Sequence, residues 1–525
     1  FFRIQMKIDC TLHITDVVPP LPRSERGRPS KIHISPQGNL LVYPSSNVVA
    51  LLNVDDLSVI HIFRQHRFET TAVKFSPDGQ FIASGDKGGE VFVCQTEAPF
   101  EHKYKHVIGG EISDIAWSPD GKKIAVVGDG KPVYFELKTG SSGGDLSCHS
   151  RRIESIDIHP NIKDNMILMA SHDSRISIFD RSKGGPRPKY SQQLTTHSKE
   201  VYTVAFNNDG SLFVSGGSDG RLVVYDTVTK AVIGERKHDR SITSAAFISL
   251  PSLAKGDTVD FNDRICDLIV YASTDGYVRA LRLLNPDEID ESGTQIKDEW
   301  EWNEKGDPSL TQRLALAVSV PFNCVIVISS SGKLEKIRAS SGESISSLYG
   351  HKGHIRSIDI HNQFIITGDN SGRLCLSIDD APVVPFGIQQ TKAIRGLSIS
   401  SSNDTILVLR MNNELQFYSL SESTVLSTVS LPSEPVSMSC GRSLIAIACH
   451  SHLVIIDKST RHIVCQEKLS ADSTSISIIY DDSQIAIGDV NGIVTVYTIK
   501  DGNTLNVIKE MKMKGSISQV GYSPT

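Results

Sequence analysis

The feature that most limits the fold of this chain is a short motif that returns about every 41 residues. It reads I-S-P-Q-G at 34–38, F-S-P-D-G at 75–79 and W-S-P-D-G at 117–121, and a related F-N-N-D-G lies at 206–210. Short apolar stretches stand on both sides of each copy. Because proline presets φ and glycine accepts positive φ, the motif predicts a tight turn between two β-strands.

A second turn motif follows in many of the repeats. It reads G-S-D-G at 217–220, S-T-D-G at 273–276 and D-V-N-G at 489–492, and a further apolar stretch comes next, as in L-V-V-Y-D at 222–226. Three strands in about 40 residues, with a weaker linking strand, make the four-stranded blade of a β-propeller. We find no convincing amphipathic helix. The sequence therefore predicts an all-β chain of propeller blades.

The first strands divide the chain into twelve units, and the twelfth stops just after its first strand, which is expected near residue 516. One propeller seldom exceeds eight blades, so twelve units predict two propellers in tandem. We expect an N-terminal segment over 1–30, a seven-bladed propeller over 31–350, and a second propeller over 351–525 that is incomplete and truncated by roughly two blades. A five-bladed second ring is the alternative. A strand expected over 2–14 is a candidate to complete a blade of the second ring.

One repeat carries a polar set that indicates the type of blade. His197 opens the repeat, Ser215 lies on its second strand, Asp219 in the next turn, and Tyr225 near the end of the third strand. This is the WD-repeat pattern, with Tyr where Trp is usual, so we expect both propellers to be of the WD40 type. We interpret the set as a structural hydrogen-bonded staple and not as a catalytic triad, because buried polar groups need partners. No catalytic residues are predicted.

With the repeats laid out, the chain resembles a known WD-repeat family. The segments that show the resemblance are L-P-R-S-E-R-G-R-P at 21–29, I-A-S-G-D at 82–86, D-I-A-W-S-P-D at 114–120 and I-A-I-G-D at 485–489, and they occur in the same order as in the family. The resemblance is to the actin-interacting protein 1 family. It implies two seven-bladed rings, binding of actin filaments together with cofilin (ADF), disassembly of cofilin-decorated filaments, and no enzymatic activity.

The same resemblance implies partner-binding residues in the first propeller. Asp129 stands where the family has a glutamate, and Lys189-Tyr190 stands where it has a Lys-Phe pair. Two positions depart from the family: His172, with Asp173 beside it, replaces an acidic residue, and Glu200 replaces a phenylalanine. All of these residues are candidates for the contact with actin and cofilin.

The amino-acid composition limits the classes of partner, cofactor and compartment that we expect. The chain has 54 Lys and Arg against 60 Asp and Glu, a formal charge of −6, which argues against nucleic acid or an anionic membrane as the main partner. The nine cysteines are odd in number and never spaced as CxxC, so we expect no disulfide framework, no metal site and no other cofactor, and a reducing compartment. No apolar run approaches a membrane span. We expect a monomer in the cytoplasm on the actin cytoskeleton.

Other signals have ordinary interpretations. Residues 216–220 match the GxSxG pattern of an esterase nucleophile, but a strand and not a helix follows, which favours a hairpin turn. In E-W-E-W at 299–302 both indoles share one face, either of an outer strand or of a partner-binding anchor. The basic linker 181–187 is a solvated loop or steers the protein onto acidic actin.

The alternative function is a WD40 adaptor in trafficking or ubiquitin transfer without actin binding; a propeller enzyme is a distant third.

Overall fold

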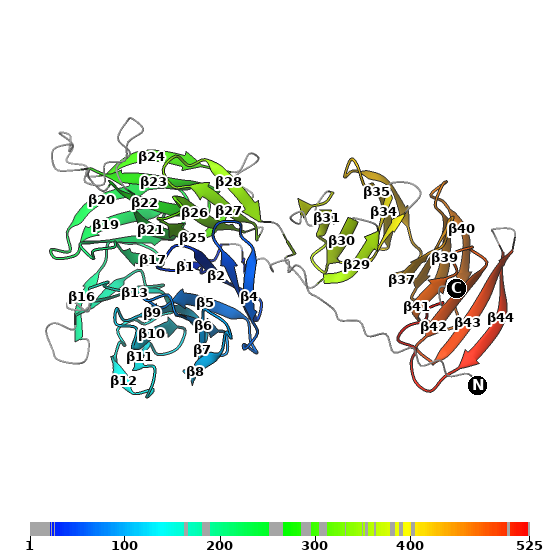
Figure 1. Ribbon diagram of the computed structural model, residues 1–525, viewed down its shortest axis with the longest axis horizontal. Helices are drawn as coiled ribbons and strands as arrows, with labels where there is room; N and C mark the ends of the chain where they lie inside the picture. The colour runs from blue at the N-terminus through cyan, green and yellow to red at the C-terminus, as the bar shows by residue number, and fades with distance from the viewer. Residues whose placement is uncertain are drawn as a thin grey trace. The chain divides into compact units, whose positions relative to one another are not determined.

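The fold was analysed in a computed structural model, and in the residues it describes the chain is all-β with no helix (Figure 1). The described residues are 22, 24–25, 27–161, 166–180, 189–250, 266–284, 296–303, 312–330, 332–348, 350–351, 355–361, 364–378, 384–387, 392–400, 405–500 and 504–522. The strand proposed over 2–14 lies outside them. Among these residues there is no helix long and apolar enough to cross a membrane.

The strands form four-stranded antiparallel sheets, eleven in the described residues, and in every sheet the strands pair in chain order. The chain divides into two compact units, residues 1–348 and 349–525. The predicted all-β fold of tandem four-stranded propeller blades is confirmed.

In the described residues the first unit holds seven sheets. Their strands are β1 (His33–Ile34), β2 (Leu40–Ser45), β3 (Val48–Asn53) and β4 (Val59–Phe63); β5 (Thr70–Phe75), β6 (Phe81–Asp86), β7 (Glu90–Gln95) and β8 (His102–Val107); β9 (Ile112–Trp117), β10 (Lys123–Gly128), β11 (Val133–Glu136) and β12 (Ser142–Asp145); β13 (Ile153–Ile158), β14 (Ile167–Ser171), β15 (Ile176–Asp180) and β16 (Lys189–Leu194); β17 (Val201–Phe206), β18 (Leu212–Gly217), β19 (Arg221–Asp226) and β20 (Val232–Lys237); β21 (Ile242–Leu250), β22 (Cys266–Ser273), β23 (Val278–Leu283) and β24 (Ile296–Trp302); β25 (Arg313–Ser319), β26 (Cys324–Ser329), β27 (Leu334–Arg338) and β28 (Ser344–Leu348).

The second unit holds four sheets in the described residues. Their strands are β29 (Ile355–His361), β30 (Phe364–Asp369), β31 (Leu374–Ile378) and β32 (Val384–Pro385); β33 (Ile394–Ser400), β34 (Thr405–Arg410), β35 (Glu414–Ser419) and β36 (Val425–Ser430); β37 (Pro435–Cys440), β38 (Leu444–Cys449), β39 (His452–Asp457) and β40 (Ile463–Lys468); β41 (Ser473–Ile478), β42 (Gln484–Asp489), β43 (Ile493–Lys500) and β44 (Thr504–Lys512).

The repeated S-P-D-G motif makes the turn between the first and second strands of a blade. At 75–79 the Gly79 amide donates to the Ser76 carbonyl at 2.9 Å, and Gly79 has φ of 75°, which favours glycine. The Ser76 hydroxyl accepts from the Phe81 amide, also at 2.9 Å. The turn is thus held by its own serine, and the buried β-branched and aromatic residues around it continue as strands.

The first unit is a closed ring, because its last blade contacts its first. β25 lies against β1, and the two share one hydrophobic core cluster with β2, β3, β26 and β27. The Ser30 amide donates to the Leu314 carbonyl at 3.0 Å, and the Ser319 hydroxyl donates to the Gly38 carbonyl at 2.8 Å. The ring therefore closes by packing and hydrogen bonds between complete blades.

Neighbouring blades are also joined at their innermost strands. A side chain on one first strand accepts a hydrogen bond from a backbone amide on the next. Asp114 accepts from the Ile156 amide at 3.1 Å, and Asp157 accepts from the Phe206 amide at 2.9 Å. The second unit has the same joint, where Asp359 accepts from the Ile399 amide at 2.6 Å. Amide groups on the exposed edge of an inner strand thereby find partners.

In the second unit β29, β33, β37 and β41 contact one another in series. The prediction of a twelfth first strand near residue 516 is wrong for the described residues, because 513–522 form no strand. A strand needs a backbone ladder with a neighbour, whereas here the Ile517 amide donates to the Asp489 carbonyl at 3.1 Å and the Tyr522 amide donates to the Ser477 hydroxyl at 3.3 Å, without a paired run of residues. Ile517 nevertheless lies against Gly488 as Ile394, which opens β33, lies against Gly368.

Candidate functional site

The WD staple side chains in the fifth blade of the first unit are within hydrogen-bonding distance of one another. His197 Nδ1 lies 3.0 Å from Asp219 Oδ1, and His197 Nε2 lies 2.7 Å from Ser215 Oγ. The Ser215 hydroxyl in turn donates to Tyr225 Oη at 3.3 Å. His197, Ser215 and Tyr225 are buried, so the set fastens the start of the blade to its second and third strands.

Other blades contain related sets that the sequence analysis missed. His66 lies 2.8 Å from Asp86 and 2.7 Å from Ser84. A histidine followed by Ser and Asp at this spacing is the sequence signal that would have predicted this set. In the fourth blade His149 Nδ1 lies 2.9 Å from Asp173. Asp173, a candidate for partner binding, therefore holds its own blade together.

Two blades use a buried arginine at a comparable place. Arg313 Nε donates to the Gly276 carbonyl at 3.0 Å, and Arg410 Nη1 donates to the Gly372 carbonyl at 3.1 Å. Both glycines belong to the second turn motif of the preceding blade. These arginines thus join one blade to the one before it and are almost completely buried.

The remaining candidates separate onto two ends of the first ring. Strands alternate in direction, so the turns after β10 and β14 and the segment before β17 lie at one end of the blades, which we name the upper face. Asp129, His172 and Glu200 lie there. Lys189 and Tyr190 begin β16 at the opposite end, the lower face, because Lys189 pairs with Asp180 at the end of β15. Tyr190 is 51% exposed.

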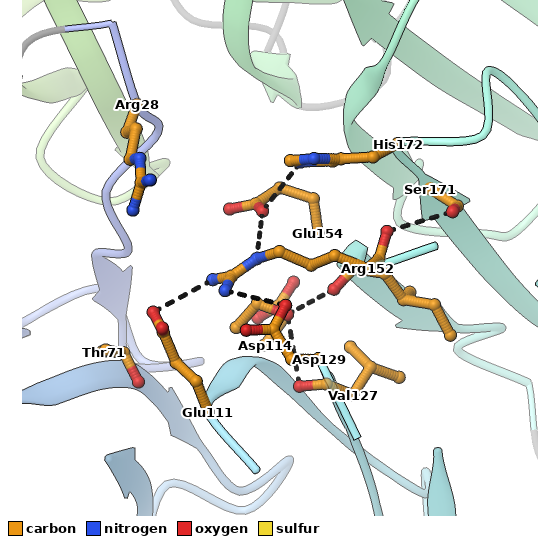
Figure 2. Close-up of polar contacts among 12 residues, drawn as sticks. Arg28, Thr71, Glu111, Asp114, Val127, Asp129, Arg152, Glu154, Ser171 and His172 are labelled. Atoms are coloured by element: carbon orange, nitrogen blue, oxygen red, sulfur yellow. Dashed lines mark hydrogen bonds and ion pairs between the residues drawn. The ribbon is translucent and has the colours of Figure 1, made fainter. Parts of the chain in front are cut away.

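The upper face carries a charged cluster centred on Arg152, which Figure 2 shows between three carboxylates. Its Nε donates to Glu154 at 2.9 Å, Nη2 to Glu111 at 3.3 Å, and Nη1 lies 3.2 Å from Asp129. His172 Nε2 lies 3.2 Å from the same Glu154 oxygen. Asp129 and His172, two of the candidates, are therefore parts of one network that spans the third and fourth blades.

Local geometry brings these groups together. The Asp129 amide donates to the Glu111 carbonyl at 3.0 Å. That carbonyl is so close to Gly128 that a Cβ there would lie 1.9 Å away, so the approach requires glycine. A backbone contact between two loops thus fixes the separation of the Glu111 and Asp129 side chains before Arg152 binds between them.

Electrostatics keeps the cluster charged. Burial acts to lower the pKa of Arg152, but Glu154, Glu111 and Asp129 outweigh it and raise that pKa. Burial acts to raise the pKa of Glu154, whereas the His172 hydrogen bond and the charges of Arg152 and Lys31 lower it. The Asp129 carboxylate is half exposed. It is therefore an anionic group in a fixed position that a partner can reach.

Sequence analysis missed Arg152, Glu111 and Glu154. None of them belongs to a local motif, and Arg152 contacts Glu111 and Asp129 of the preceding blade, of which Glu111 lies 41 residues away in sequence. Only the turn positions of the blades, considered together in three dimensions, would have indicated them.

The two tryptophans of β24 are not an exposed anchor. Both are partly buried and pack on the core shared with the next blade, and Trp300 Nε1 donates to the Ala339 carbonyl at 2.9 Å. The Arg313 guanidinium lies over Trp302 at 4.7 Å. The indoles therefore contribute to contact between blades.

Few other side chains in the described part of the chain are arranged as a nucleophile, metal or reactive-thiol site. Of the G-x-S-x-G residues, 216–217 end β18 and 218–220 form the turn to β19, so the GxSxG serine does not precede a helix there. No group of three His, Cys, Asp or Glu side chains in the described residues is placed to hold a metal ion. The described cysteines are free thiols, and burial raises the pKa of Cys94 to about 12.

Comparison with protein families accounts for this architecture. The family described as WD domain, G-beta repeat, matches residues 57–94, 102–131 and 188–226. Each match begins near the outer strand of one blade and continues into the next blade. The chain contains WD repeats. The sequence repeat is thus offset from the structural blade by one strand.

Similar proteins extend this result along the chain. Actin-interacting protein 1 of Drosophila melanogaster is 26% identical over 96% of this chain and 79% of its own length. Actin-interacting protein 1 of Caenorhabditis elegans is 26% identical over 97% and 81%. WD repeat-containing protein 1 of Xenopus tropicalis is 25% identical over 96% and 80%. The resemblance to the actin-interacting protein 1 family is confirmed, and this WD-repeat chain is similar to proteins named for an interaction with actin.

Proposed function

We propose that this WD-repeat protein binds actin filaments that carry cofilin and promotes their disassembly, without catalysing a reaction. The observation that carries the proposal is the Arg152 cluster on the upper face of the first ring. It holds Asp129 half exposed at the position where the family resemblance places an acidic contact residue. The similarity to actin-interacting proteins over 96% of the chain supports actin as the partner.

The two groups of candidates suggest two contacts. β16 spans Lys189–Leu194, and at ~3.3 Å per residue its ends lie roughly 17 Å apart. Tyr190 is therefore well separated from Glu200, which follows the other end of this strand. We assign the upper face to one filament component and the Lys189-Tyr190 corner to a neighbouring one, so that a filament carrying both actin and cofilin binds at two places.

Disassembly follows if binding is selective. A ligand shifts an equilibrium only by its difference in affinity between two states. A protein that binds the cofilin-decorated filament, or fragments of it, better than the bare filament would move the population toward those states. No covalent step is needed.

The proposal is tested by co-sedimentation with actin filaments, with and without cofilin. Asp129→Lys is compared with the matched control Glu97→Lys, an exposed charge reversal elsewhere on the first ring. Tyr190→Ala tests the lower corner. We expect cofilin-dependent binding that falls in Asp129→Lys and in Tyr190→Ala but not in Glu97→Lys.

Each other outcome has a defined meaning. If the folded wild-type chain does not bind under either condition, the proposal is wrong, and a WD40 adaptor in trafficking or ubiquitin transfer becomes the better hypothesis. If binding is equal with and without cofilin, cofilin recognition is wrong while actin binding stands. If binding falls in only one of the two variants, only the contact made by that residue is supported.

A further inference from the structure

A groove of about 600 Å³ lies on the second unit, between two neighbouring blades. One wall is β36, the outer strand of its blade, at residues 427–429. The other wall is the segment 460–463, which joins the third and fourth strands of the next blade. The groove is separate from the first ring and from every residue in the proposed actin contact.

The charge of the groove has one sign. Arg461 and His462 are its ionisable residues, and its lining includes no carboxylate. The Arg461 guanidinium lies 5.7 Å from the centre of the Phe417 ring, which belongs to the blade across the groove. That contact holds the cation at the boundary between the blades. A ligand that fits here therefore carries negative charge.

The wall opposite the cations offers unused hydrogen-bonding capacity. Ser427 Oγ is buried and has no hydrogen-bond partner within the described structure. Thr428, beside it, is exposed, and Thr460 adds a hydroxyl from the other wall. A buried hydroxyl without a partner is uncommon, and the exposed Thr428 is the residue of this wall that a ligand in the groove can contact.

β36 also lacks the features that normally protect an outer strand. Its sequence, V-L-S-T-V-S, contains no charged residue and no proline. The outer strands β4, V-I-H-I-F, and β28, S-I-S-S-L, are likewise free of lysine, arginine, aspartate, glutamate and proline, whereas β8, β20, β24, β40 and β44 each carry lysine, arginine or glutamate. Such charges on an edge strand prevent pairing with other chains. Val and Thr favour extended structure, so this edge is suited to accept a further strand.

We propose that β36 binds an extended acidic segment of a partner protein as an added strand. Backbone hydrogen bonds to the strand edge provide affinity, and alternate side chains of the segment point into the groove. Their carboxylates bind the Arg461 guanidinium through charge-assisted hydrogen bonds and accept a hydrogen bond from the His462 imidazole. The partner class is thus a protein with an exposed, extended stretch in which acidic residues alternate with β-forming ones.

The test uses the full chain and a fluorescent peptide of alternating Val and Glu, followed by anisotropy. The same peptide with Lys for Glu tests charge, and one with Pro for Val tests the backbone bonds. Arg461→Gln/His462→Gln removes the guanidinium and the imidazole, and Lys509→Gln/Lys512→Gln is its matched control on the exposed outer strand β44. Thr428→Pro and Thr428→Lys block the edge by two different means.

We expect the Val-Glu peptide to bind, and its affinity to fall about tenfold in Arg461→Gln/His462→Gln, which corresponds to ~1.4 kcal/mol. The lysine control should bind as wild type, and both Thr428 variants should lose binding while circular dichroism shows the fold unchanged. Equal binding of the lysine peptide, equal binding of the proline peptide, or no binding at all would overturn the proposal. A concentration-dependent dimer that Thr428→Lys abolishes, without peptide binding, would mean that β36 pairs with a second copy instead.

Discussion

The buried ion pair of Arg313 and Glu335 gives a direct test of how the last blade of the first ring is held. Arg313 Nη1 donates to Glu335 Oε2 at 2.5 Å, and both side chains are almost fully buried, at 1% and 2% exposure. Lys333 Nζ also lies 3.0 Å from Glu335. Replacing Arg313 with methionine keeps the volume but removes the donor to Gly276 and the main partner of Glu335.

The magnitude follows from these contacts. Removing one partner of a buried ion pair costs about 3–5 kcal/mol, because the other charge stays buried. Lys333 remains beside Glu335, so we expect the lower end, ~3 kcal/mol. With an unfolding entropy of ~2.1 cal/mol/K per residue over roughly 320 residues, this corresponds to a Tm lower by about 4–5 °C.

Thermal unfolding followed by tryptophan fluorescence measures the change, and Trp302, which lies under Arg313, reports on the same place. The double variant Arg313→Met/Glu335→Met removes both charges of the pair, so it should lose less stability than Arg313→Met alone. The reasoning is refuted if Arg313→Met melts at the wild-type temperature, or if the double variant is less stable than the single one.

Two further predictions concern titration and reactivity. Burial acts to raise the pKa of Asp219, but hydrogen bonds from His197 and from the Ser198 amide dominate and hold it at about 2, below the ordinary 3.8. Because the pKa of Asp219 is lower in the folded chain, this carboxylate stabilises the fold above about pH 4 and loses that effect as pH falls toward 2. The difference in Tm between wild type and Asp219→Asn should therefore narrow over this range. A difference in Tm that stays constant would contradict the prediction. Burial raises the pKa of Cys94 and Cys375 to about 12, so both thiols should react with iodoacetamide at pH 8 far more slowly in the folded chain than in urea, as residue-level mass spectrometry can measure. Equal labelling rates would show that these thiols are not buried.

The sequence predicted the blades where the turns have a strong chemical requirement. The S-P-D-G turn at 75–79 needs a glycine with positive φ and a serine that binds the backbone, and both leave a visible motif. The outer strands were only weakly predicted. β12 reads S-G-G-D and β28 reads S-I-S-S-L, and neither has the apolar pattern of a buried strand. Outer strands are fixed by pairing within the blade more than by their own composition.

The candidate site was less predictable, since it depends on which end of a blade a residue occupies. Counting strands would have placed Lys189 at the lower end, because it follows a third strand. The role of Asp173 could not be separated from partner binding without knowing that His149 lies beside it. The contacts of Arg152 join loops from two blades, and no pattern within one repeat encodes them.

The joints that aspartates make between innermost strands have a direction, because in each one the earlier blade accepts and the later blade donates, whereas hydroxyls such as that of Thr71 donate in the opposite sense, to the Ile112 carbonyl of the next blade. Asp114 accepts from the fourth blade, Asp157 of that blade accepts from the fifth, and Asp359 repeats the arrangement in the second unit. A repeat of this kind brings its own acceptor for the blade after it and its own donor for the blade before it. Duplication or deletion of a neighbouring repeat would still leave such an aspartate beside a backbone amide of the blade that follows. Because the donor is a backbone amide, which every residue except proline carries, this joint does not depend on which repeat follows.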